Sequence, residues 1–328
     1  MIRLLNEHDV ARALAGVDLV ALMAEALRAF SSRDVVQPTR TVLSVGPDQA
    51  FFGVMPAWVP ARDALGAKLV SVFARNLERG LPTHAATVLL FDAATGALAA
   101  VLDGRFITEV RTAAVSVLAA ETLAAGPIRR AAVFGCGVQA RSHVRAMAAR
   151  WPLLEQVRVW SPLDDCQPFA ASMRAELDSR IDVAAGTSAD ATARDADLIV
   201  LVTSATEPVL ALEWVRPGAM VVAVGACRPT HRELDPALVA DARVFVDSRD
   251  AALVESGDIV CGIAEGRFGP GHVRGELGDV LLGQLAAREA AGDRVIFKSL
   301  GLAVEDVTVA DVACRRALDM GLGTAWSF

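Results

Sequence analysis

The sequence lacks the features that mark several common protein classes. Its 328 residues contain no apolar stretch of the roughly 18 residues that a membrane-spanning helix needs. Glu7 and Asp9 stand where the apolar segment of a signal peptide would lie. The net charge is −7, and Lys and Arg do not cluster as they do in proteins that follow a phosphate backbone. We therefore expect a soluble, cytoplasmic protein that binds neither membranes nor nucleic acid.

Paired thiols and metal-binding patterns are also missing. The five cysteines are widely spaced and include no CxxC pair. An odd number of cysteines at this spacing predicts neither a disulfide framework nor a zinc site. The five histidines are isolated, without an HExxH pattern or a nearby cluster of carboxylates. We expect no metal.

The first part of the chain predicts an α+β unit. Residues 8–31 have the pattern of an amphipathic helix that is interrupted near Gly16. Five β-like runs follow between residues 39 and 104, and the last two flank a hairpin loop with the sequence AATG. Helical spacing returns over residues 107–124. The strands of residues 1–125 are therefore expected to be mostly antiparallel.

The pattern changes at Gly126. Short apolar strands then alternate with helices, which is typical of a doubly wound parallel sheet. Residues 295–323 predict a strand-like piece and a long helix. We expect an α/β protein in which a Rossmann-type domain of residues 126–298 is inserted between two parts of a first domain, 1–125 and 299–328. The length suffices for both domains.

The segment AAVFGCGVQA predicts a dinucleotide-binding turn. Gly135 permits a tight turn, Gly137 lets backbone approach a pyrophosphate, and the small Ala140 lets helix and strand pack closely. The N-terminus of the following helix, which begins near Val138 and Gln139, offers free N–H groups to phosphates. The alternative interpretation is a tight structural turn.

The end of the next strand bears on the choice of cofactor. A residue that reads the ribose 2′-hydroxyl of NAD would be an acid at that strand end. This chain has Ser161 there, and its acids come only at Asp164 and Asp165, which we expect to point away from the ribose. Ser161 could donate to a 2′-phosphate, although no arginine stands beside it. The pattern favours NADP(H), with NAD(H) as the alternative.

Three cationic residues interrupt apolar neighbourhoods in the first domain. Lys68 lies within an apolar strand, where a lysine is either exposed at an edge or kept for chemistry. Arg40 and Arg111 are either surface residues or a bidentate clamp on a substrate carboxylate. Arg111 and Thr112 could instead face the cofactor phosphates.

Several segments resemble the ornithine cyclodeaminase/mu-crystallin family. They include GVMPAWV, GLPTHAATVLLFDAATGALAAVLDGRFITEVRTAA, FGCGVQARSH, VGACRPTHREL and KSLGLAVEDV, and they extend from about residue 40 to the C-terminal helix. The resemblance implies a Rossmann domain and a substrate domain whose sheet pairs in a homodimer. It also implies NAD(P) chemistry on an α-amino or α-imino acid.

The resemblance further implies roles for individual residues. Arg40 and Arg111 would hold the substrate carboxylate, and Lys68 would stand beside the reacting carbon as the catalytic residue. The substrate would also contact Met55, Cys227 and Gly301. The cofactor would contact Thr112, Gly135, Gly137, Val138, Gln139, Ala140, Ser161, Thr203, Ser204, Ala226 and Cys227.

Two positions separate reactions within this family. Cyclodeaminases carry an aspartate where this chain has Cys227, and a carboxylate before the Met-Pro pair where this chain has Gly53. Both departures favour a reductase of cyclic ketimines, which would convert Δ1-piperideine-2-carboxylate or Δ1-pyrroline-2-carboxylate to pipecolate or proline. The alternatives are an alanine-dehydrogenase-like enzyme, an ornithine or lysine cyclodeaminase, and a binding or structural protein.

A protonated cyclic iminium is already an electrophile, so orientation would do most of the catalytic work. Lys68 would either donate a proton to the imine or anchor the carboxylate. We interpret Cys227 as a small, uncharged residue beside the nicotinamide, since neither Arg228 nor His231 is clearly placed to activate it. His84 either lines the substrate pocket or is structural, and its place at a hairpin edge favours the structural interpretation.

Overall fold

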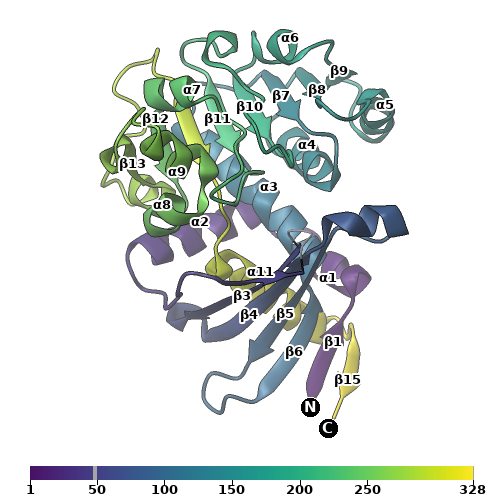
Figure 1. Ribbon diagram of the computed structural model, residues 1–328. Helices are drawn as coiled ribbons and strands as arrows, with labels where there is room; N and C mark the ends of the chain where they lie inside the picture. Colours follow the sequence, from purple (N-terminus) through teal and green to yellow (C-terminus); the bar gives the residue numbers. More distant parts are fainter. Residues whose placement is uncertain (47–49, 328) are drawn as a thin grey trace. The chain divides into compact units, whose positions relative to one another are not determined.

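The computed structural model describes residues 1–46 and 50–327 (Figure 1). The chain forms two compact units. Unit 1 consists of the described parts of Met1–Arg111 and Gly301–Phe328, and unit 2 is Thr112–Leu300. Unit 2 is thus an insertion in the sequence of unit 1, and the first boundary lies within helix α3 (Gly104–Leu123), before the boundary that we placed at residue 125. The assignment of substrate and cofactor to separate domains stays a prediction.

Seven strands in the described part of unit 1 form one sheet with the order β15-β1-β6-β5-β4-β3-β2. The strands are β1 (Ile2–Leu5), β2 (Thr41–Val45), β3 (Ala50–Val59), β4 (Ala64–Val72), β5 (His84–Phe91), β6 (Leu98–Asp103) and β15 (Thr324–Trp326). Strands β2 to β6 pair antiparallel, as their alternating pattern predicts. The terminal strands β1 and β15, which we did not predict, pair with each other at one edge (Figure 1).

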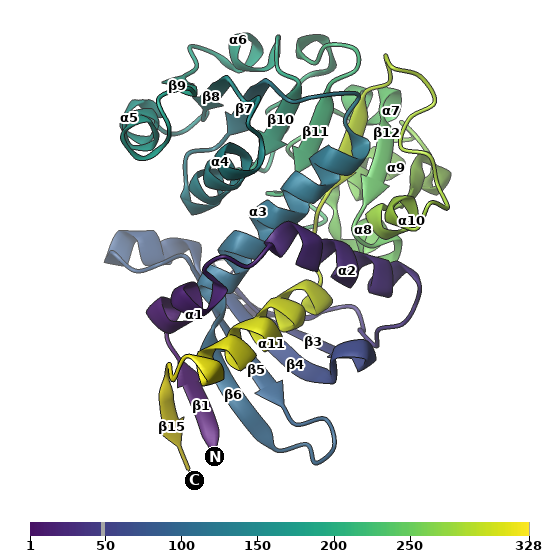
Figure 2. The ribbon, with the colours of Figure 1, turned by 180° about the vertical axis from the view of Figure 1, so that it is seen from behind.

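One face of this sheet, the inner face, packs against helix α11 (Ala303–Asp319), which Figure 2 shows lying across the strands. Helices α1 (Glu7–Leu14) and α2 (Leu19–Ser31) pack beside α11. The break between them confirms the predicted interruption, because Gly16 has φ +74° and Asp18 caps the second helix by accepting a hydrogen bond from the Ala21 amide. Short 3₁₀ turns lie at Pro60–Arg62 and Ala74–Arg79.

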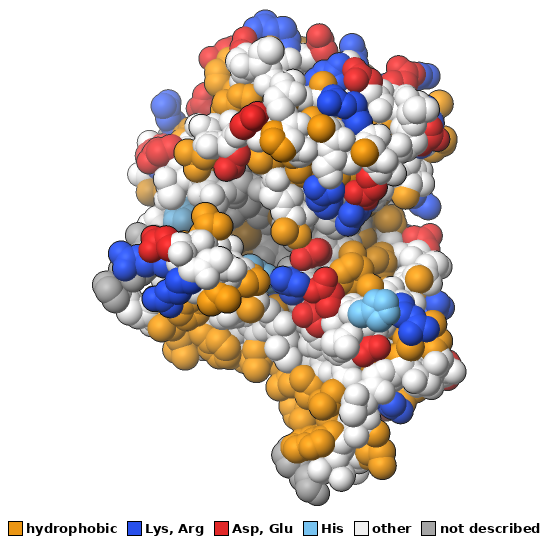
Figure 3. Space-filling view, turned by 90° about the vertical axis from the view of Figure 1, so that its right-hand side faces the viewer, with side chains coloured by type: hydrophobic (Ala, Val, Ile, Leu, Met, Phe, Trp, Pro, Cys, Tyr) orange, Lys and Arg blue, Asp and Glu red, His pale blue; other side chains and the backbone are white. Residues whose placement is uncertain are grey.

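The opposite face, which we call the outer face, is apolar and only partly covered. Cross-strand pairs such as Val54 with Leu69, and Ala67 with Leu89, belong to this face. These residues are half-buried, while Leu43 and Trp58 are 57% and 42% exposed. Hydrophobic side chains gather in the lower half of Figure 3, where unit 1 is drawn. Large exposed apolar surfaces of this kind mark interaction sites.

Unit 2 contains a parallel sheet of eight described strands, in the order β13-β12-β14-β11-β10-β7-β8-β9. The strands are β7 (Arg130–Phe134), β8 (Gln156–Trp160), β9 (Asp182–Ala185), β10 (Leu198–Leu201), β11 (Met220–Ala223), β12 (Arg243–Val246), β13 (Val273–Glu276) and β14 (Val295–Lys298). The order turns back at the junction of β7 and β10, as a doubly wound sheet requires. The predicted parallel sheet is confirmed.

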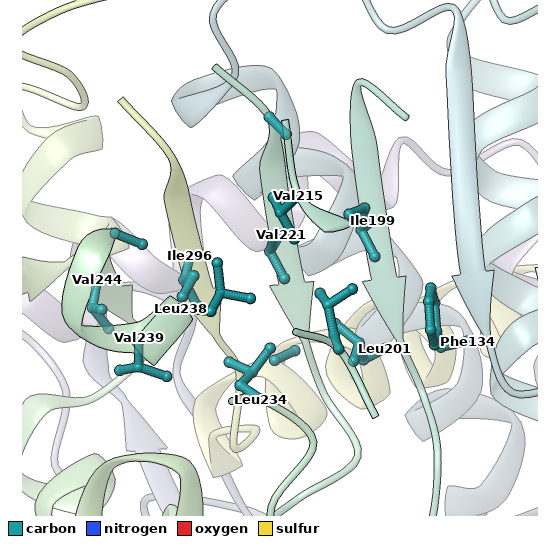
Figure 4. Packing of buried hydrophobic residues seen from close by; sticks show 14 of the residues in the cluster. Phe134, Ile199, Leu201, Val215, Val221, Leu234, Leu238, Val239, Val244 and Ile296 are labelled. Atoms are coloured by element: carbon teal, nitrogen blue, oxygen red, sulfur yellow. The ribbon is translucent and has the colours of Figure 1, made fainter. Parts of the chain in front are cut away.

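Helices cover the strands of unit 2. They are the second half of α3, α4 (Val138–Arg150), α5 (Gln167–Glu176), α6 (Ala189–Ala193), α7 (Pro236–Asp241), α8 (Arg249–Glu255), α9 (Gly257–Ala264) and α10 (Leu277–Leu281), with 3₁₀ turns at Leu212–Trp214 and Pro270–His272. Figure 4 shows the core on one face, where Phe134, Leu201 and Val221 of the sheet belong to one cluster with Leu238 and Val239 of α7. None of the helices in the described residues is long and apolar enough to cross a membrane.

Candidate functional site

Lys68 lies in the middle of β4 on the inner face of unit 1. It is opposite Met55 of β3 and Val88 of β5, and it is only 2% exposed. Its Nζ atom is 2.5 Å from Oδ2 of Asp306, a residue in the first turn of α11. A lysine is buried in this way only when it is paired, so the alternative of an exposed strand edge is wrong.

Arg111 meets the same helix end. Its Nε donates to Asp306 Oδ1 at 3.0 Å, and its Nη1 donates to Glu305 Oε2 at 2.8 Å. Asp306 therefore bridges Arg111 and Lys68. Glu305 also accepts a hydrogen bond from the Leu302 amide, and carboxylates are favoured in the first turn of a helix. The surface interpretation of Arg111 is wrong, since its side chain is buried.

Arg40 joins this group through the backbone of Gly301, whose carbonyl accepts a hydrogen bond from Arg40 Nη2 at 3.1 Å. Gly301 has φ +80°, and a Cβ atom there would lie 2.8 Å from Arg111 Nη2. The positive φ favours glycine here, and any side chain would displace the Arg111 guanidinium. We name Arg40, Lys68, Arg111, Glu305 and Asp306 the cationic cluster. Three cations and two carboxylates leave it one net positive charge when Lys68 is protonated.

Burial lowers the pKa of Lys68 to about 8, and the charges of Arg111 and Arg40 act in the same direction, while Asp306 opposes them. Burial alone would raise the pKa of Asp306, but Arg111 and Lys68 outweigh it and the pKa is lowered. Asp306 therefore stays ionised. Lys68, by contrast, can lose a proton near neutral pH, which suits a general acid.

The two lysines of this chain are unusual in their placement. All other cationic side chains of the Lys and Arg type are arginines, and the lysines are Lys68 and Lys298. Both are almost completely buried and both are paired with an aspartate, Asp306 and Asp258 respectively. Lysine differs from arginine in that its pKa can be shifted into the physiological range.

His84 also belongs to the surroundings of Lys68. It begins β5 opposite Val72, which places it on the inner face. Burial lowers its pKa to about 4, and Lys68 and Arg111 contribute to this shift. A neutral imidazole thus faces the cationic cluster, which favours the interpretation that His84 lines the substrate pocket. Between it and Lys68 lies the row of Gly53 and Val70, where a Cβ atom on Gly53 would be 3.0 Å from Val70 Cγ1.

In unit 2, the glycine turn after β7 has the geometry that a pyrophosphate requires. Gly135 has φ +105°, and a Cβ atom there would lie 2.8 Å from the Val202 carbonyl oxygen. Gly137 is the N-cap of α4, so no side-chain hydrogen bond caps the start of this helix. A Cβ atom on Gly137 would lie in open space. Ala140 is fully buried. These residues fit a dinucleotide phosphate. It would lie before Gly137 and accept hydrogen bonds from the backbone amides of the first turn of α4.

This geometry predicts that two alanine substitutions both weaken nucleotide binding but differ in their effect on stability. Gly135→Ala forces a side chain into a positive φ and against Val202, so we expect a stability loss of about 1–3 kcal/mol and weaker nucleotide binding. Gly137→Ala meets no protein atom within 4 Å, so we expect it to keep wild-type stability while binding NADH at least tenfold more weakly. Urea unfolding and titration calorimetry measure both. Normal NADH binding by Gly137→Ala would contradict the phosphate site.

The remaining members of the predicted turn are placed around α4. Val138 is exposed, and the Gln139 carbonyl accepts from His143 Nδ1 at 2.7 Å. Thr112 is buried in α3, where its carbonyl accepts a hydrogen bond from Ser116. The contacts of these residues with a cofactor stay predictions.

At the end of β8, Ser161 donates a hydrogen bond to Asp164 Oδ2 at 2.9 Å and accepts one from the Asp164 amide. The expectation that Asp164 and Asp165 point away from the ribose stays a prediction. The turn folds Asp164 back toward Ser161 because the serine hydroxyl caps it. A carboxylate thus stands beside the group that we expected to receive a 2′-phosphate.

The loops after β10 and β11 hold the other predicted cofactor residues. Thr203 and Ala226 direct their amides at the buried carboxylate of Glu233, and Ser204 is exposed. The Cys227 thiol donates to the Val224 carbonyl oxygen at 3.2 Å. The interpretation of Cys227 as a small lining residue beside the nicotinamide stays a prediction.

Sequence reasoning missed several buried charged residues of the two units. Those used below are Glu233, Asp258, Lys298, Glu305 and Asp306. Two adjacent acids at the start of an apolar helix, next to Gly301, were the available signal for the last pair. In the described residues, no group of three or more His, Cys, Asp or Glu side chains could hold a metal ion.

The chain is a two-unit protein of the Rossmann type. Its second unit has a doubly wound parallel sheet with a glycine turn, and its first unit carries the buried cationic cluster. The chain belongs to the ornithine cyclodeaminase/mu-crystallin family, whose model matches residues 2–320. This confirms the resemblance seen in the sequence.

Three known proteins illustrate the match. Ketimine reductase mu-crystallin of Rattus norvegicus is 42% identical over 278 residues, which are 84% of this chain and 83% of that protein. The structure of Thermococcus litoralis Δ1-pyrroline-2-carboxylate reductase in complex with NADH and L-proline matches with a TM-score of 0.94 and 32% identity, covering 99% of this chain and 100% of that one. An archaeal alanine dehydrogenase dimer with bound NAD matches with a TM-score of 0.91 and 27% identity, covering 100% and 99%.

Proposed function

We propose that this protein is an NAD(P)H-dependent reductase of cyclic ketimine carboxylates. The observation that carries the proposal is the cationic cluster, in which a lysine with a pKa of about 8 lies beside two arginines. Its single net positive charge matches one substrate carboxylate. The names of the rat and Thermococcus relatives, a ketimine reductase and a Δ1-pyrroline-2-carboxylate reductase, support the same reaction class.

The chemistry assigns a task to each side chain. Arg40 and Arg111 hold the carboxylate, because a guanidinium binds it with two parallel hydrogen bonds. Lys68 holds a proton for the imine nitrogen. When bound, the reduced nicotinamide supplies a hydride to the imine carbon. The C=N bond thereby gains one hydride and one proton and becomes the CH–NH group of the cyclic amino acid.

The surroundings of Lys68 favour a substrate without a second amine. Gly53 offers no carboxylate on the inner face, and the pKa of His84 keeps that residue uncharged at neutral pH. Ornithine or lysine would bring a side-chain ammonium to a site that is already cationic, so cyclodeamination is disfavoured. Alanine-dehydrogenase-like activity remains the second candidate, because the same carboxylate clamp would accept pyruvate imine.

A substrate panel tests this function. The purified protein is assayed for NADH and NADPH oxidation with Δ1-piperideine-2-carboxylate, Δ1-pyrroline-2-carboxylate, and pyruvate with ammonia. We expect the cyclic imines to give a kcat/KM at least a hundredfold above that of pyruvate. Ammonia release from ornithine without cofactor turnover, or no turnover with either cyclic imine, would refute the proposal.

The sequence favoured NADP(H) on the strength of Ser161. The carboxylate of Asp164 beside that hydroxyl would repel a 2′-phosphate and can accept a hydrogen bond from a ribose hydroxyl, so we now expect NADH to have the lower KM. Asp164→Asn is expected to reduce the NADH preference at least fivefold, since it removes the repelling charge. Asp165→Asn is the matched control, because Asp165 instead caps the Gln167 amide. A lower KM for NADPH in the wild type would contradict this expectation.

We also propose that the outer face of unit 1 forms a homodimer. Its half-buried apolar rows, around Val54, Leu69 and Leu89, fit a self-complementary contact better than exposure to water. Leu69→Glu is expected to convert the dimer to a monomer in sedimentation velocity, because a charge would be buried at the contact. Ala21→Glu on the exposed side of α2 is the control and should stay dimeric. A dimeric Leu69→Glu variant would exclude this face.

A further inference from the structure

A second buried charged group, in unit 2, has no part in the chemistry assigned to Lys68. It consists of Glu233 between β11 and α7, Asp258 in the first turn of α9, and Lys298 at the end of β14. Asp258 Oδ1 accepts the amides of Glu233 and Leu234 at 2.8 and 3.0 Å. Lys298 Nζ lies 3.3 Å from Asp258 Oδ2 and offsets part of the negative charge.

Glu233 ties two loops together. Its Oε1 accepts from the amide and from the hydroxyl of Thr203, both at 2.8 Å. Its Oε2 accepts from the amides of Gly225 and Ala226, at 2.7 and 3.1 Å. The four acceptor positions of one carboxylate are thus filled, two by the loop after β10 and two by the loop after β11.

Two glycines make this arrangement sterically strict. A Cβ atom on Gly225 would lie 2.0 Å from the Thr203 carbonyl oxygen and 2.5 Å from Glu233 Oε1. A Cβ atom on Gly257 would lie 2.1 Å from the His231 carbonyl oxygen. The backbone of the loop that contains Cys227 is therefore held by close packing on two sides and by a buried carboxylate.

The place of these loops in the sheet points to what they hold. Strand β10 neighbours β7, whose following turn contains Gly135 and Gly137, and β8 lies on the other side of β7. In a doubly wound sheet the pyrophosphate lies at that turn and the adenosine half extends over the second strand. The nicotinamide half then lies over the ends of β10 and β11, which Glu233 joins.

We propose that Glu233 is a positioning residue for the nicotinamide end of the cofactor. It holds the backbone of Thr203 and of residues 225–227 in the one arrangement that receives the ring. It acts through these loops, because its own acceptors are already used by them. The proposal rests on the dinucleotide-dependent function proposed above, and it concerns only one end of the dinucleotide.

Comparing two ligands tests this role. ADP-ribose contains the adenosine and pyrophosphate parts of NADH but lacks the nicotinamide ring. In Glu233→Gln an NH₂ group replaces one acceptor, so one pair of loop donors loses its partner. We expect calorimetry to give a Kd for NADH about tenfold above that of the wild type, and a Kd for ADP-ribose within twofold. The fluorescence of bound NADH should also change, since it reports the surroundings of the ring.

The controls separate positioning from folding. Asp235→Asn, two residues away, affects only the cap of α7 and should bind both ligands as the wild type does. Glu233→Asp keeps the charge but cannot reach both loops, so an intermediate loss of NADH affinity is expected, about threefold, even if Glu233→Gln does not fold. Equal losses for NADH and ADP-ribose, or no loss for either, would overturn the proposal. A wild type that binds neither ligand would instead refute the dinucleotide function.

Discussion

Replacing Lys68 with methionine is expected to lower kcat/KM for a cyclic ketimine by about a thousandfold, within the range measured for the loss of a general acid. Methionine fills a similar volume on the inner face but has neither a proton to give nor a charge. Asp306 keeps Arg111 as a partner in this variant, so the fold should survive. Steady-state kinetics with Δ1-piperideine-2-carboxylate measures the effect.

An arginine variant then separates the two roles of Lys68. Lys68→Arg keeps the positive charge, but a guanidinium does not give up its proton at neutral pH. If Lys68 is the proton donor, as we propose, Lys68→Arg should stay within tenfold of Lys68→Met. Recovery of most wild-type activity would show that Lys68 only anchors the carboxylate. Arg28→Met on the exposed side of α2 is the control for removing a cation, and full activity of Lys68→Met would refute the assignment altogether.

The fold could be predicted from the sequence where local pattern and tertiary structure agree. Strands β2 to β6 alternate because their two faces differ, and the central strands β10 and β11 of unit 2 are continuous apolar runs because they are buried throughout. Strand β13, by contrast, contains the polar segment Arg274–Glu276, and its four residues become a strand only through pairing with β12. Strands β1 and β15 have only four and three residues, and they form where the two ends of the chain meet.

The sequence pointed to the cationic residues of the candidate site but not to its carboxylates. Lys68 and Arg111 stood out because each interrupts an apolar segment. Glu305 and Asp306 did not, because acids in a first helical turn look like solvated residues that favour the helix dipole. Their burial depends on the docking of α11 against the inner face. Glu233 was missed for a similar reason, since a loop glutamate between an arginine and a leucine gives no sign that four donors surround it.

The buried carboxylate of Asp306 leads to the second large effect. Asp306 raises the pKa of Lys68 through its charge and its hydrogen bond, against the lowering by burial, Arg111 and Arg40. In Asp306→Asn the raising influence is gone, so the pKa of Lys68 must fall below the wild-type value of about 8. The variant should also lose about 3–5 kcal/mol of stability, because it breaks a buried ion pair on one side. Urea unfolding measures that loss.

The pH dependence of kcat/KM tests the coupling itself. A general acid works in its protonated form, so wild-type activity should be level at neutral pH and fall as pH rises through about 8. Asp306→Asn should begin this fall at a lower pH. Glu305→Gln is the matched variant, since Glu305 pairs with Arg111 whereas Asp306 pairs directly with Lys68, so its fall should move less than that of Asp306→Asn. If kcat/KM of Asp306→Asn fell at the same pH as in the wild type, or at a higher pH, the titrating group would not be Lys68.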